Sequence, residues 1–257
     1  MRSGGLKGAC QAHFEKSRLK PRLKGQWPIP PEQSAEFVWR MEDVLEVYSR
    51  PYDGRLPQVC LDEKSRQLLA EAGEPPPMAP GRPAREDYEY EREGVANLFI
   101  VSEPLRGWRR VSVIERRTKI DWAHQIKELV DVHCPHAEKI VLVMDNLNTH
   151  NPPPLYEALD PGEARRLTEK LEIHYTPKHG SWLNMAEIEL SVLARQCLDR
   201  RIPDRPTLRH EAAAWEEERN AMENSIDWRF TTADARIKLK HLYPEILKEP
   251  SHEPNCS

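Results

Sequence analysis

Two aspartates follow apolar segments of the kind that form buried strands. Asp62 comes directly after residues 59–61, and Asp145 comes directly after the apolar run 140–144. A carboxylate at the end of a strand projects from the edge of an open α/β sheet, which is where ligands bind in such folds. A single aspartate at such a place is commonly only a cap or turn residue. Two of them at matching positions favour a functional pair.

A third acidic residue comes from a strongly predicted helix, residues 182–198, which carries Glu187 and Glu189. At 100° per residue these two side chains point to nearly opposite sides of the helix, so we expect at most one of them to face the sheet. Apolar residues occupy much of the helix circumference and align with either acid. Periodicity alone therefore does not choose between them.

Three converging carboxylates suit a pair of divalent cations. Magnesium prefers hard oxygen ligands, keeps several waters and typically takes one or two protein carboxylates per ion. Two such ions can activate an attacking oxygen and stabilise the leaving oxygen when a phosphodiester is cleaved in line. This chemistry requires acidic side chains at three places and little else.

Stretches around these acids resemble the motifs of one family. Residues 141–150, Val-Leu-Val-Met-Asp-Asn-Leu-Asn-Thr-His, resemble the second-aspartate motif of mariner-like DDE transposases, specifically of the bacterial insertion sequence 630 type. Residues 175–187, Tyr-Thr-Pro-Lys-His-Gly-Ser-Trp-Leu-Asn-Met-Ala-Glu, resemble the third-acid motif, in which an asparagine precedes the glutamate by three positions. Residues 60–63, Cys-Leu-Asp-Glu, fit the first-aspartate strand. The resemblance covers about residues 18–244.

The resemblance implies a triad of Asp62, Asp145 and Glu187, separated by 83 and 42 positions, and thereby prefers Glu187 to Glu189. It implies that Asp62 bridges two Mg²⁺ ions while Asp145 and Glu187 each hold one, and that Mn²⁺ can substitute. The implied reaction is hydrolysis of double-stranded DNA at transposon ends, followed by joining of the freed 3′-hydroxyl to target DNA, with preference for a TA step. No covalent protein–DNA intermediate is implied. A homodimer on DNA is expected, because such enzymes act on paired ends.

Five further residues are candidates for supporting the site or binding DNA. Asn146 and His150 could orient water or contact a phosphate, or could simply begin a turn and cap the next segment. Lys178 and His179 lie in a Gly/Ser loop before the predicted helix, and we favour phosphate contact over a plain loop because the loop adjoins the third acid. Asn184 could position the turn that carries this acid, although asparagine at a helix start is most often only a cap.

The order of predicted elements indicates an α/β fold. A helix at 32–49 precedes three strands, of which the last two form a hairpin, and helices then alternate with strands. This order matches a ribonuclease-H-like fold, a mixed five-stranded sheet flanked by helices. The expected strands are 59–62, 96–103, 109–115, 139–144 and 171–175, and the expected later helices are one that Asp121 caps and Pro135 closes, then 161–170, 182–198, 206–222 and 233–242, the last with a capping box of Thr231 and Asp234.

We divide the chain into five parts. They are a basic irregular arm (1–31), a linker helix (32–54), the ribonuclease-H-like DDE catalytic domain (55–203), C-terminal helices packed on it (204–249) and a tail (250–257). A proline-rich stretch at 74–83 is expected to be a long exposed loop. The arm is too short for the helix-turn-helix modules that such transposases usually carry. We therefore expect a separate DNA-recognition chain, an upstream module joined by frameshifting, or a truncated copy.

The composition excludes several other classes of protein. The chain has 257 residues, and its longest apolar run, 140–144, is too short for a membrane span. Residues 1–30 lack the apolar segment of a secretory signal, and five cysteines without a C-x-x-C pair fit a reducing compartment. Together with the resemblance, this predicts a cytoplasmic, nucleoid-associated bacterial protein without a membrane partner.

Charge is unevenly distributed along the chain. The net charge is −4, but residues 1–25 carry +6 and the remainder −10. A basic arm on an acidic body indicates an anionic partner at one end, or else a solvated tail. Basic residues at 109–110 and 116–119 either line a DNA channel or lie at solvated strand and loop ends.

Two other functions stay open. One is a stand-alone metal-dependent nuclease of the same fold, and the other is a catalytically silent DNA-binding or dimerising remnant. An intact triad disfavours the remnant, because a silent copy loses such acids by drift. Metal-dependent cleavage separates an enzyme from a remnant, and strand joining separates a transposase from a simple nuclease.

Overall fold

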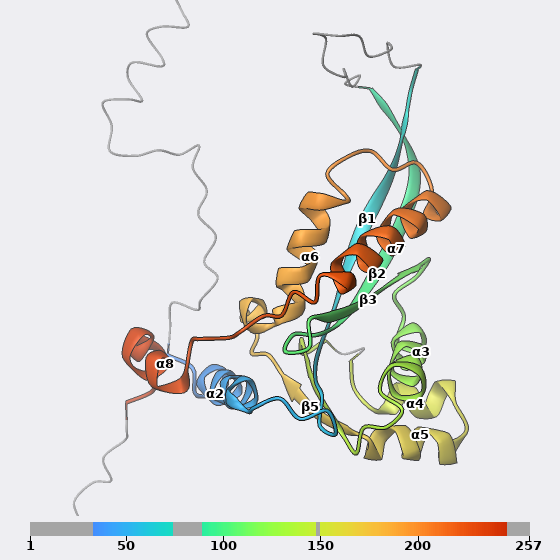
Figure 1. The fold of residues 1–257 in the computed structure, drawn as a ribbon. Coiled ribbons are helices and arrows are strands. Elements are labelled where there is room, and N and C mark those ends of the chain that lie inside the picture. The colour runs from blue at the N-terminus through green and yellow to red at the C-terminus, as the bar shows by residue number, and fades with distance from the viewer. Residues whose placement is uncertain (1–32, 74–88, 148–149, 246–257) are drawn as a thin grey trace, which may run out of the picture.

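The fold is built on one mixed five-stranded sheet. A computed structural model describes residues 33–73, 89–147 and 150–245 of the chain. The strand order in the sheet is β3-β2-β1-β4-β5 (Figure 1). The strands are β1 (Gln58–Glu71), β2 (Tyr90–Glu103), β3 (Trp108–Ile114), β4 (Ile140–Met144) and β5 (Leu171–Tyr175).

The sheet changes from antiparallel to parallel pairing at β1. On one side β1, β2 and β3 form an antiparallel meander, and on the other side β1, β4 and β5 are parallel. All five residues of β4 are buried, which explains its continuous apolar sequence. β1 and β2 are the longest strands, and Figure 1 shows them extending beyond the rest of the sheet as a two-stranded ribbon.

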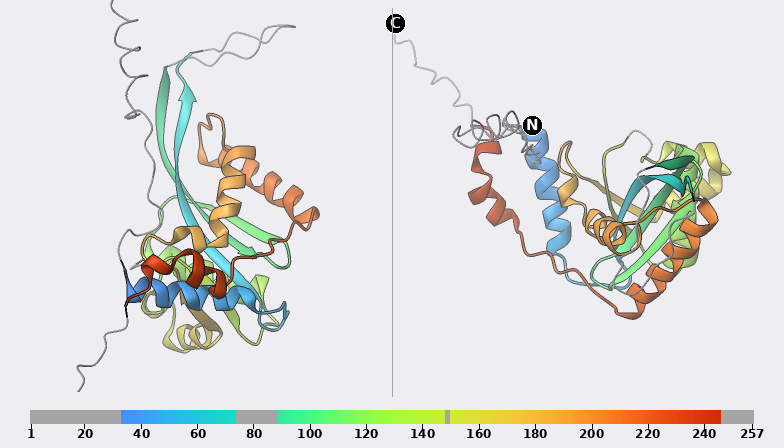
Figure 2. Two further views of the ribbon diagram at one scale, coloured as in Figure 1. Left: turned by 90° about the vertical axis from the view of Figure 1, so that its left-hand side faces the viewer. Right: turned by 90° about the horizontal axis from the view of Figure 1, so that it is seen from above.

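Helices cover both faces of the sheet. They are α2 (Ala35–Ser49), α3 (Lys119–Glu128), α4 (Pro153–Ala158), α5 (Pro161–Glu169), α6 (Met185–Gln196), α7 (Arg205–Ala221) and α8 (Thr232–Lys238), with short turns η1 (Leu129–His133), η2 (Ser181–Leu183) and η3 (Lys240–Leu242). Figures 1 and 2 show α3, α4 and α5 on one face, α6 and α7 on the other, and α2 beside α8. Among the helices described, none is long and apolar enough to cross a membrane.

Alternation along β4 divides the apolar side chains into two cores. Val141 and Val143 join the core that also contains residues of α2, α6, α7 and α8. Ile140, Leu142 and Met144 join the core under α3, α4 and α5. Because successive side chains of a strand point to opposite faces, a single five-residue strand contributes to both cores.

The predicted linker helix forms part of the first of these cores. Phe37, Met41 and Leu45 of α2 are almost completely buried in the same apolar cluster as the inner face of α6. α2 is therefore packed on the central sheet rather than separated from it.

The predicted fold class is confirmed, and most expected elements have the expected type. β5 has the expected bounds, and the capping box of Thr231 and Asp234 begins α8 as predicted. The arm at 1–31, the proline-rich loop at 74–83 and the tail at 250–257 lie outside the described residues.

Two local predictions are wrong, and one helix was not predicted. β1 does not end at Asp62 but continues to Glu71, because it pairs with β2 along this whole length regardless of its polar sequence. α4 is not expected from its proline-rich sequence, although proline is well tolerated in the first turn of a helix. The N-cap of α3 is Thr118 and not Asp121 as predicted. Asp121 lies at the third helical position, and its side chain accepts a hydrogen bond from the backbone N–H of Thr118.

Candidate active site

The parallel pairing of β1 with β4 places Asp62 beside Asp145. The last aligned pair is Cys60 with Val143, and each aspartate follows its member of this pair by two positions, so both acids lie just beyond the same end of the pairing. β4 ends at Met144 whereas β1 continues. Asp62 therefore lies within its strand, at the point where the parallel neighbour stops and leaves the edge open.

Glu187 approaches the same edge from α6. It is exposed in the first turn of that helix, where the helix dipole favours a negative charge. Asp62 and Glu187 face a common groove between β1 and α6. The residues that line this groove are Asp62, Glu63, Lys64, Glu187, Leu190, Ser191, Ala194 and Arg195. The structure thus brings the three predicted acids to one edge of the sheet.

The surroundings of Asp62 strongly raise the pKa of its carboxyl group. Its residue is only 7% exposed, and burial, together with the negative charges of Asp145, Glu187 and Glu63, raises the pKa of Asp62 from its ordinary 3.8 to about 7. The backbone N–H of Glu63, which donates to Asp62 Oδ1 at 2.7 Å, lowers this pKa and offsets part of the rise. The site therefore favours a proton, or another positive charge, at Asp62.

His150 lies behind Asp145 and holds its carboxylate. The ring is completely buried, with Nδ1 2.8 Å from Asp145 Oδ1 and Nε2 3.7 Å from Glu63 Oε2. Burial disfavours the imidazolium, but the carboxylates of Asp145 and Glu63 outweigh it and raise the pKa of His150 to about 9. Trp122 stacks on the ring, and the Tyr175 hydroxyl donates to the His150 carbonyl at 2.8 Å. A ring buried in this way orients Asp145; it neither caps α4 nor reaches a phosphate at the surface.

Asn184 ties the start of α6 to β1. Its side-chain oxygen accepts from the Ala186 N–H at 3.1 Å, which caps the helix, and its amide donates to the Leu61 carbonyl at 2.9 Å. The Tyr48 hydroxyl donates to the Leu183 carbonyl at 2.7 Å. Since Leu61 directly precedes the first aspartate, Asn184 is both a cap and a link between the two elements that carry the acids.

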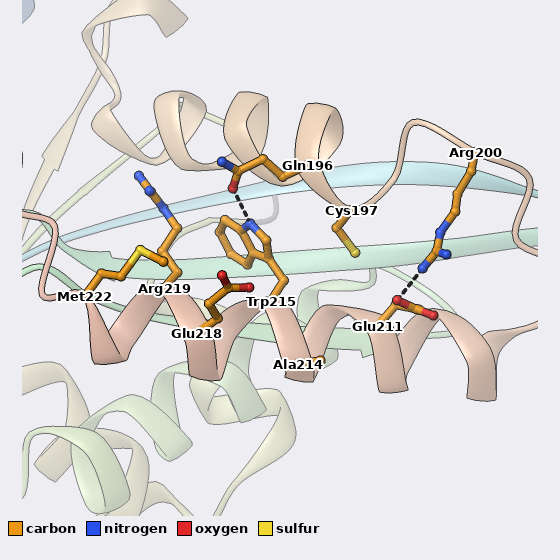
Figure 3. Close-up of a pocket in the computed structure, with 9 residues that line it drawn as sticks. All are labelled: Gln196, Cys197, Arg200, Glu211, Ala214, Trp215, Glu218, Arg219 and Met222. Atoms are coloured by element: carbon orange, nitrogen blue, oxygen red, sulfur yellow. Dashed lines mark hydrogen bonds and ion pairs between the residues drawn. The ribbon is translucent and has the colours of Figure 1, made fainter.

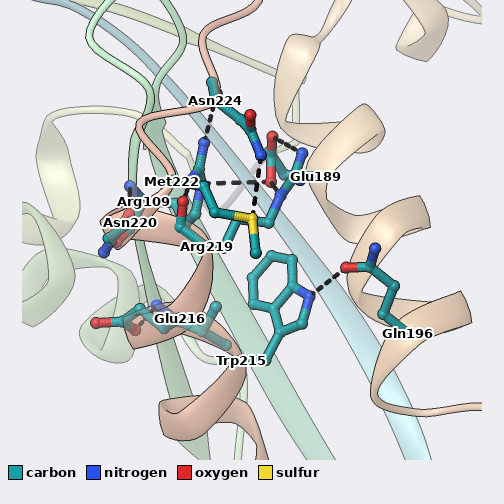
Figure 4. A network of polar contacts seen from close by, with 10 residues as sticks. Arg109, Glu189, Gln196, Trp215, Glu216, Arg219, Asn220, Met222 and Asn224 are labelled. Atoms are coloured by element: carbon teal, nitrogen blue, oxygen red, sulfur yellow. Dashed lines mark hydrogen bonds and ion pairs between the residues drawn. The ribbon is translucent and has the colours of Figure 1, made fainter.

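Glu189 fixes the other side of α6 (Figure 4). It is completely buried, and the guanidinium of Arg219 in α7 forms a bidentate ion pair with its two carboxylate oxygens, at N···O distances of 2.9 and 3.0 Å. Arg109 of β3 adds a third contact at 3.3 Å. The two acids of α6 therefore lie on different sides of the helix, as expected: Glu189 points into the protein and pairs with two arginines, while Glu187 is exposed in the groove.

The same network excludes Arg109 from a DNA channel. Its guanidinium is 1% exposed and donates to the carbonyls of Arg219 and Asn224 at 2.7 and 2.9 Å. Other basic residues of the two clusters are also paired: Arg110 with Glu216 at 3.3 Å, Arg117 with Glu63 at 2.8 Å and Lys119 with Glu157 at 2.5 Å. These side chains form ion pairs within the protein and are therefore not free to bind DNA.

Asn146, Lys178 and His179 are exposed near the acidic edge but do not line the groove. Asn146 follows the second aspartate directly. Lys178 and His179 belong to the loop after β5, where His179 adopts a left-handed conformation (φ 63°). Gly180 must stay small, since a Cβ there would lie 2.5 Å from Pro177 Cγ. The loop therefore holds the two side chains outward in a fixed shape.

A second hollow lies between α6 and α7 (Figure 3). Trp215 forms part of its wall, with the indole N–H donating to Gln196 at 2.9 Å, and an ion pair of Arg200 with Glu211 closes one end. None of the three acids lines it. Because the acids are absent from this hollow, the candidate site is the groove on the other side of α6.

The donor set at the acidic edge fits a divalent cation such as Mg²⁺. Asp62, Asp145 and Glu187 offer only hard oxygen donors, and burial together with the neighbouring carboxylates raises the pKa of Asp62, so that a nearby cation would stabilise its ionised form. In the ranges that the structure describes, no three His, Cys, Asp or Glu side chains are already grouped as metal ligands. Asp145 bonds His150 instead, so the acids share an edge without forming a coordination shell.

The chain belongs to the DDE superfamily endonucleases. The model of that family matches residues 57–209, which is more than half of the chain and includes all three acids. No curated protein matches the sequence. The family match identifies the chain as a DDE-type endonuclease.

Solved structures of the Mos1 transposase share the ribonuclease-H-like fold. The Mos1 paired-end complex with the left transposon end matches at a TM-score of 0.52 and 16% identity, over 84% of this chain and 66% of the Mos1 chain. The Mos1 mariner paired-end complex with Mn matches at 0.54 and 14%, over 93% and 72%. The Mos1 strand transfer complex matches at 0.52 and 16%, over 84% and 65%. The chain thus spans about two thirds of the Mos1 chains.

Four residues that shape the site were not singled out from the sequence. Lys64 follows the first aspartate by two positions and Arg195 follows the glutamate by eight, and both spacings return a side chain to the same face of its element. These spacings could have revealed them. Glu63 and Tyr175 act through His150, and only the tertiary structure shows that contact.

Replacing Glu189 by Gln should destabilise the protein by about 3–5 kcal/mol, because two arginines, one of them completely buried, lose their counter-charge. Chemical denaturation measures this loss. Glu217→Gln on the exposed face of α7 is the matched control and should change stability by less than about 0.5 kcal/mol. Equal stability of the two variants would contradict the structural role of the ion pair.

Replacing Asp62 by Asn should stabilise the metal-free protein at about pH 8. The folded state holds a proton at Asp62 up to about pH 7 whereas the unfolded state releases it near 3.8, so wild-type stability falls as the pH rises between these values. The asparagine avoids this loss, which is at most about 4 kcal/mol. Thermal melts in chelator should show a higher Tm for the variant at pH 8 and a difference that closes toward about pH 4. A difference that widens at low pH would contradict the assignment.

Proposed function

We propose that this chain is the catalytic domain of a DNA transposase of the insertion sequence 630 type. One observation carries the proposal: Asp62 lies close enough to Asp145 and Glu187 for both charges to raise its pKa, and Asp62 and Glu187 line a groove that opens to the surface. Such an edge accepts a phosphodiester backbone while the interior of the fold stays closed. The family match over the same residues supports this reading.

Asp62, Asp145 and Glu187 would hold Mg²⁺ or Mn²⁺ at two neighbouring positions. When bound, these ions supply an activated attacking oxygen and stabilise the leaving oxygen. The protein contributes the placement of the acids: His150 holds Asp145, and Asn184 sets α6 against β1. Solved Mos1 complexes with Mn and with Mg are among the similar structures and support divalent metal as the cofactor.

The substrate would be double-stranded DNA at transposon ends and then target DNA. The similar structures include Mos1 paired-end and strand transfer complexes, which supports both steps and a homodimer on DNA. Recognition of a particular end sequence would come from a separate chain or an upstream module. We further propose a bacterial cytoplasmic location, on nucleoid DNA.

Supercoiled plasmid should be nicked by the wild type with Mg²⁺ or Mn²⁺ and not in chelator. Asp62→Asn, Asp145→Asn and Glu187→Gln should each slow nicking by about a thousandfold or more, because metal-bound acids supply several kcal/mol of transition-state stabilisation. Asp160→Asn, an exposed aspartate at the start of α5 without a side-chain bond, is the control and should keep full activity. Equal nicking by wild type and Asp145→Asn would refute the site.

A second assay separates a transposase from a nuclease. A labelled oligonucleotide with a free 3′-hydroxyl at a pre-cut end should become joined to plasmid in the presence of metal. Nicking without joining would reassign the chain as a stand-alone nuclease of the same fold. Neither activity, in a folded protein, would identify it as a silent remnant.

A further inference from the structure

We propose that Lys64 and Arg195 form a subsite for backbone phosphates of the DNA strand that flanks the cleaved bond. The proposal rests on the function proposed above and adds a direction to it: the strand would run along the groove between β1 and α6, away from the acids. Neither residue belongs to the predicted site.

The first argument is the shape of the groove. Asp62 and Lys64 lie two residues apart on one face of β1, about 6.7 Å along the strand. Glu187 and Arg195 lie eight residues apart on α6, about 12 Å along the helix. That length corresponds to the rise of roughly three to four nucleotides of a duplex strand. The acids and the two cations therefore lie along one groove, and a few nucleotides of a DNA strand can span the distance between them.

The second argument is the size of the side chains between these ends. Ser191 and Ala194 follow Glu187 by four and seven positions and form the α6 wall, while Leu190 is buried beneath them. Small side chains at these places leave the groove open along its length. Closely packed helices and strands usually fill such positions with larger residues.

The third argument is charge. Most arginines of the described chain are paired with a carboxylate, as Arg117, Arg166 and Arg236 are. Within the ranges that the structure describes, Lys64 and Arg195 have no carboxylate within 4 Å and are exposed. On an acidic chain, two unpaired cations that lie along an open groove beside the acids are suited to bind a polyanion that enters this groove.

Loss of the two contacts is measured by the salt dependence of DNA binding. Each phosphate neutralised contributes about 0.9 to the slope of log K against log salt for duplex DNA, and about 0.7 for a single strand. The Lys64→Gln/Arg195→Gln double variant of the full chain should therefore lose about 1.4–1.8 from the wild-type slope, measured by fluorescence anisotropy with a labelled oligonucleotide.

The control is Lys139→Gln/Lys240→Gln. Both lysines are exposed; Lys139 precedes β4, at the end opposite the acids, and Lys240 lies in η3. This pair removes the same charge and should leave the slope near the wild-type value. A slope for Lys64→Gln/Arg195→Gln equal to that of the control pair would overturn the subsite while leaving metal-dependent nicking, and hence the proposed function, intact. A wild type that binds no DNA would overturn both.

A second measurement locates the contact. Replacing single phosphates by neutral methylphosphonates, one linkage at a time, should slow wild-type nicking at linkages within about four nucleotides of the nick. In Lys64→Gln/Arg195→Gln, the same replacements should reduce the nicking rate little further, because the cations that contact these phosphates are already absent. Additive losses at every linkage would contradict the path along the groove.

Discussion

Three like charges held at one edge of a sheet repel one another, and the surrounding structure has to resist that repulsion. Asp62 shows its effect most clearly, since burial together with the neighbouring carboxylates raises the pKa of this group to about 7. A loosely held chain would relieve the repulsion by moving the acids apart. The acids stay close because each is placed by a contact that does not involve the other two.

These contacts lie on the sides of the elements that face away from the groove. The register of β1 and β4 is set by buried apolar side chains on both faces. Asp145 is held from behind by His150, and α6 is fixed by Glu189 among arginines on its far side. The side chains that line the groove therefore do not have to stabilise the fold. Its walls can remain polar, open and small, which is what a site for a charged polymer needs.

The sequence allowed the sheet and most helices to be predicted because their signals are local. The apolar run of β4 and the period of α7 report burial directly. The length of β1 could not be predicted in the same way, because beyond Asp62 it is polar and is held by backbone pairing with β2. Backbone pairing is independent of side-chain type, so polar strand extensions leave little trace in a sequence.

The site was predictable to a similar extent and for similar reasons. Asp145 and Glu187 lie within continuous motifs, but periodicity could not separate Glu187 from Glu189, because that choice depends on Arg219, 30 positions later in the chain. His150 was a candidate for contact with water or phosphate, or for a cap, and it is instead buried, since its neighbours Trp122 and Tyr175 come from distant segments. Contacts between distant segments are decided by packing, which a single sequence does not display.

The charge of the chain places a last constraint on how it can bind DNA. The residues after the first 25 sum to −10, and most of their arginines are tied to carboxylates. Within the part of the chain that the structure describes, the proposed DNA substrate would therefore be repelled by much of the surface and attracted where cations are free or where metal neutralises the acids. At the acidic edge these two conditions meet in one groove, with metal expected at one end and free cations at the other. Binding and cleavage would then be coupled, because the metal that performs the chemistry also removes the repulsion that keeps the strand out.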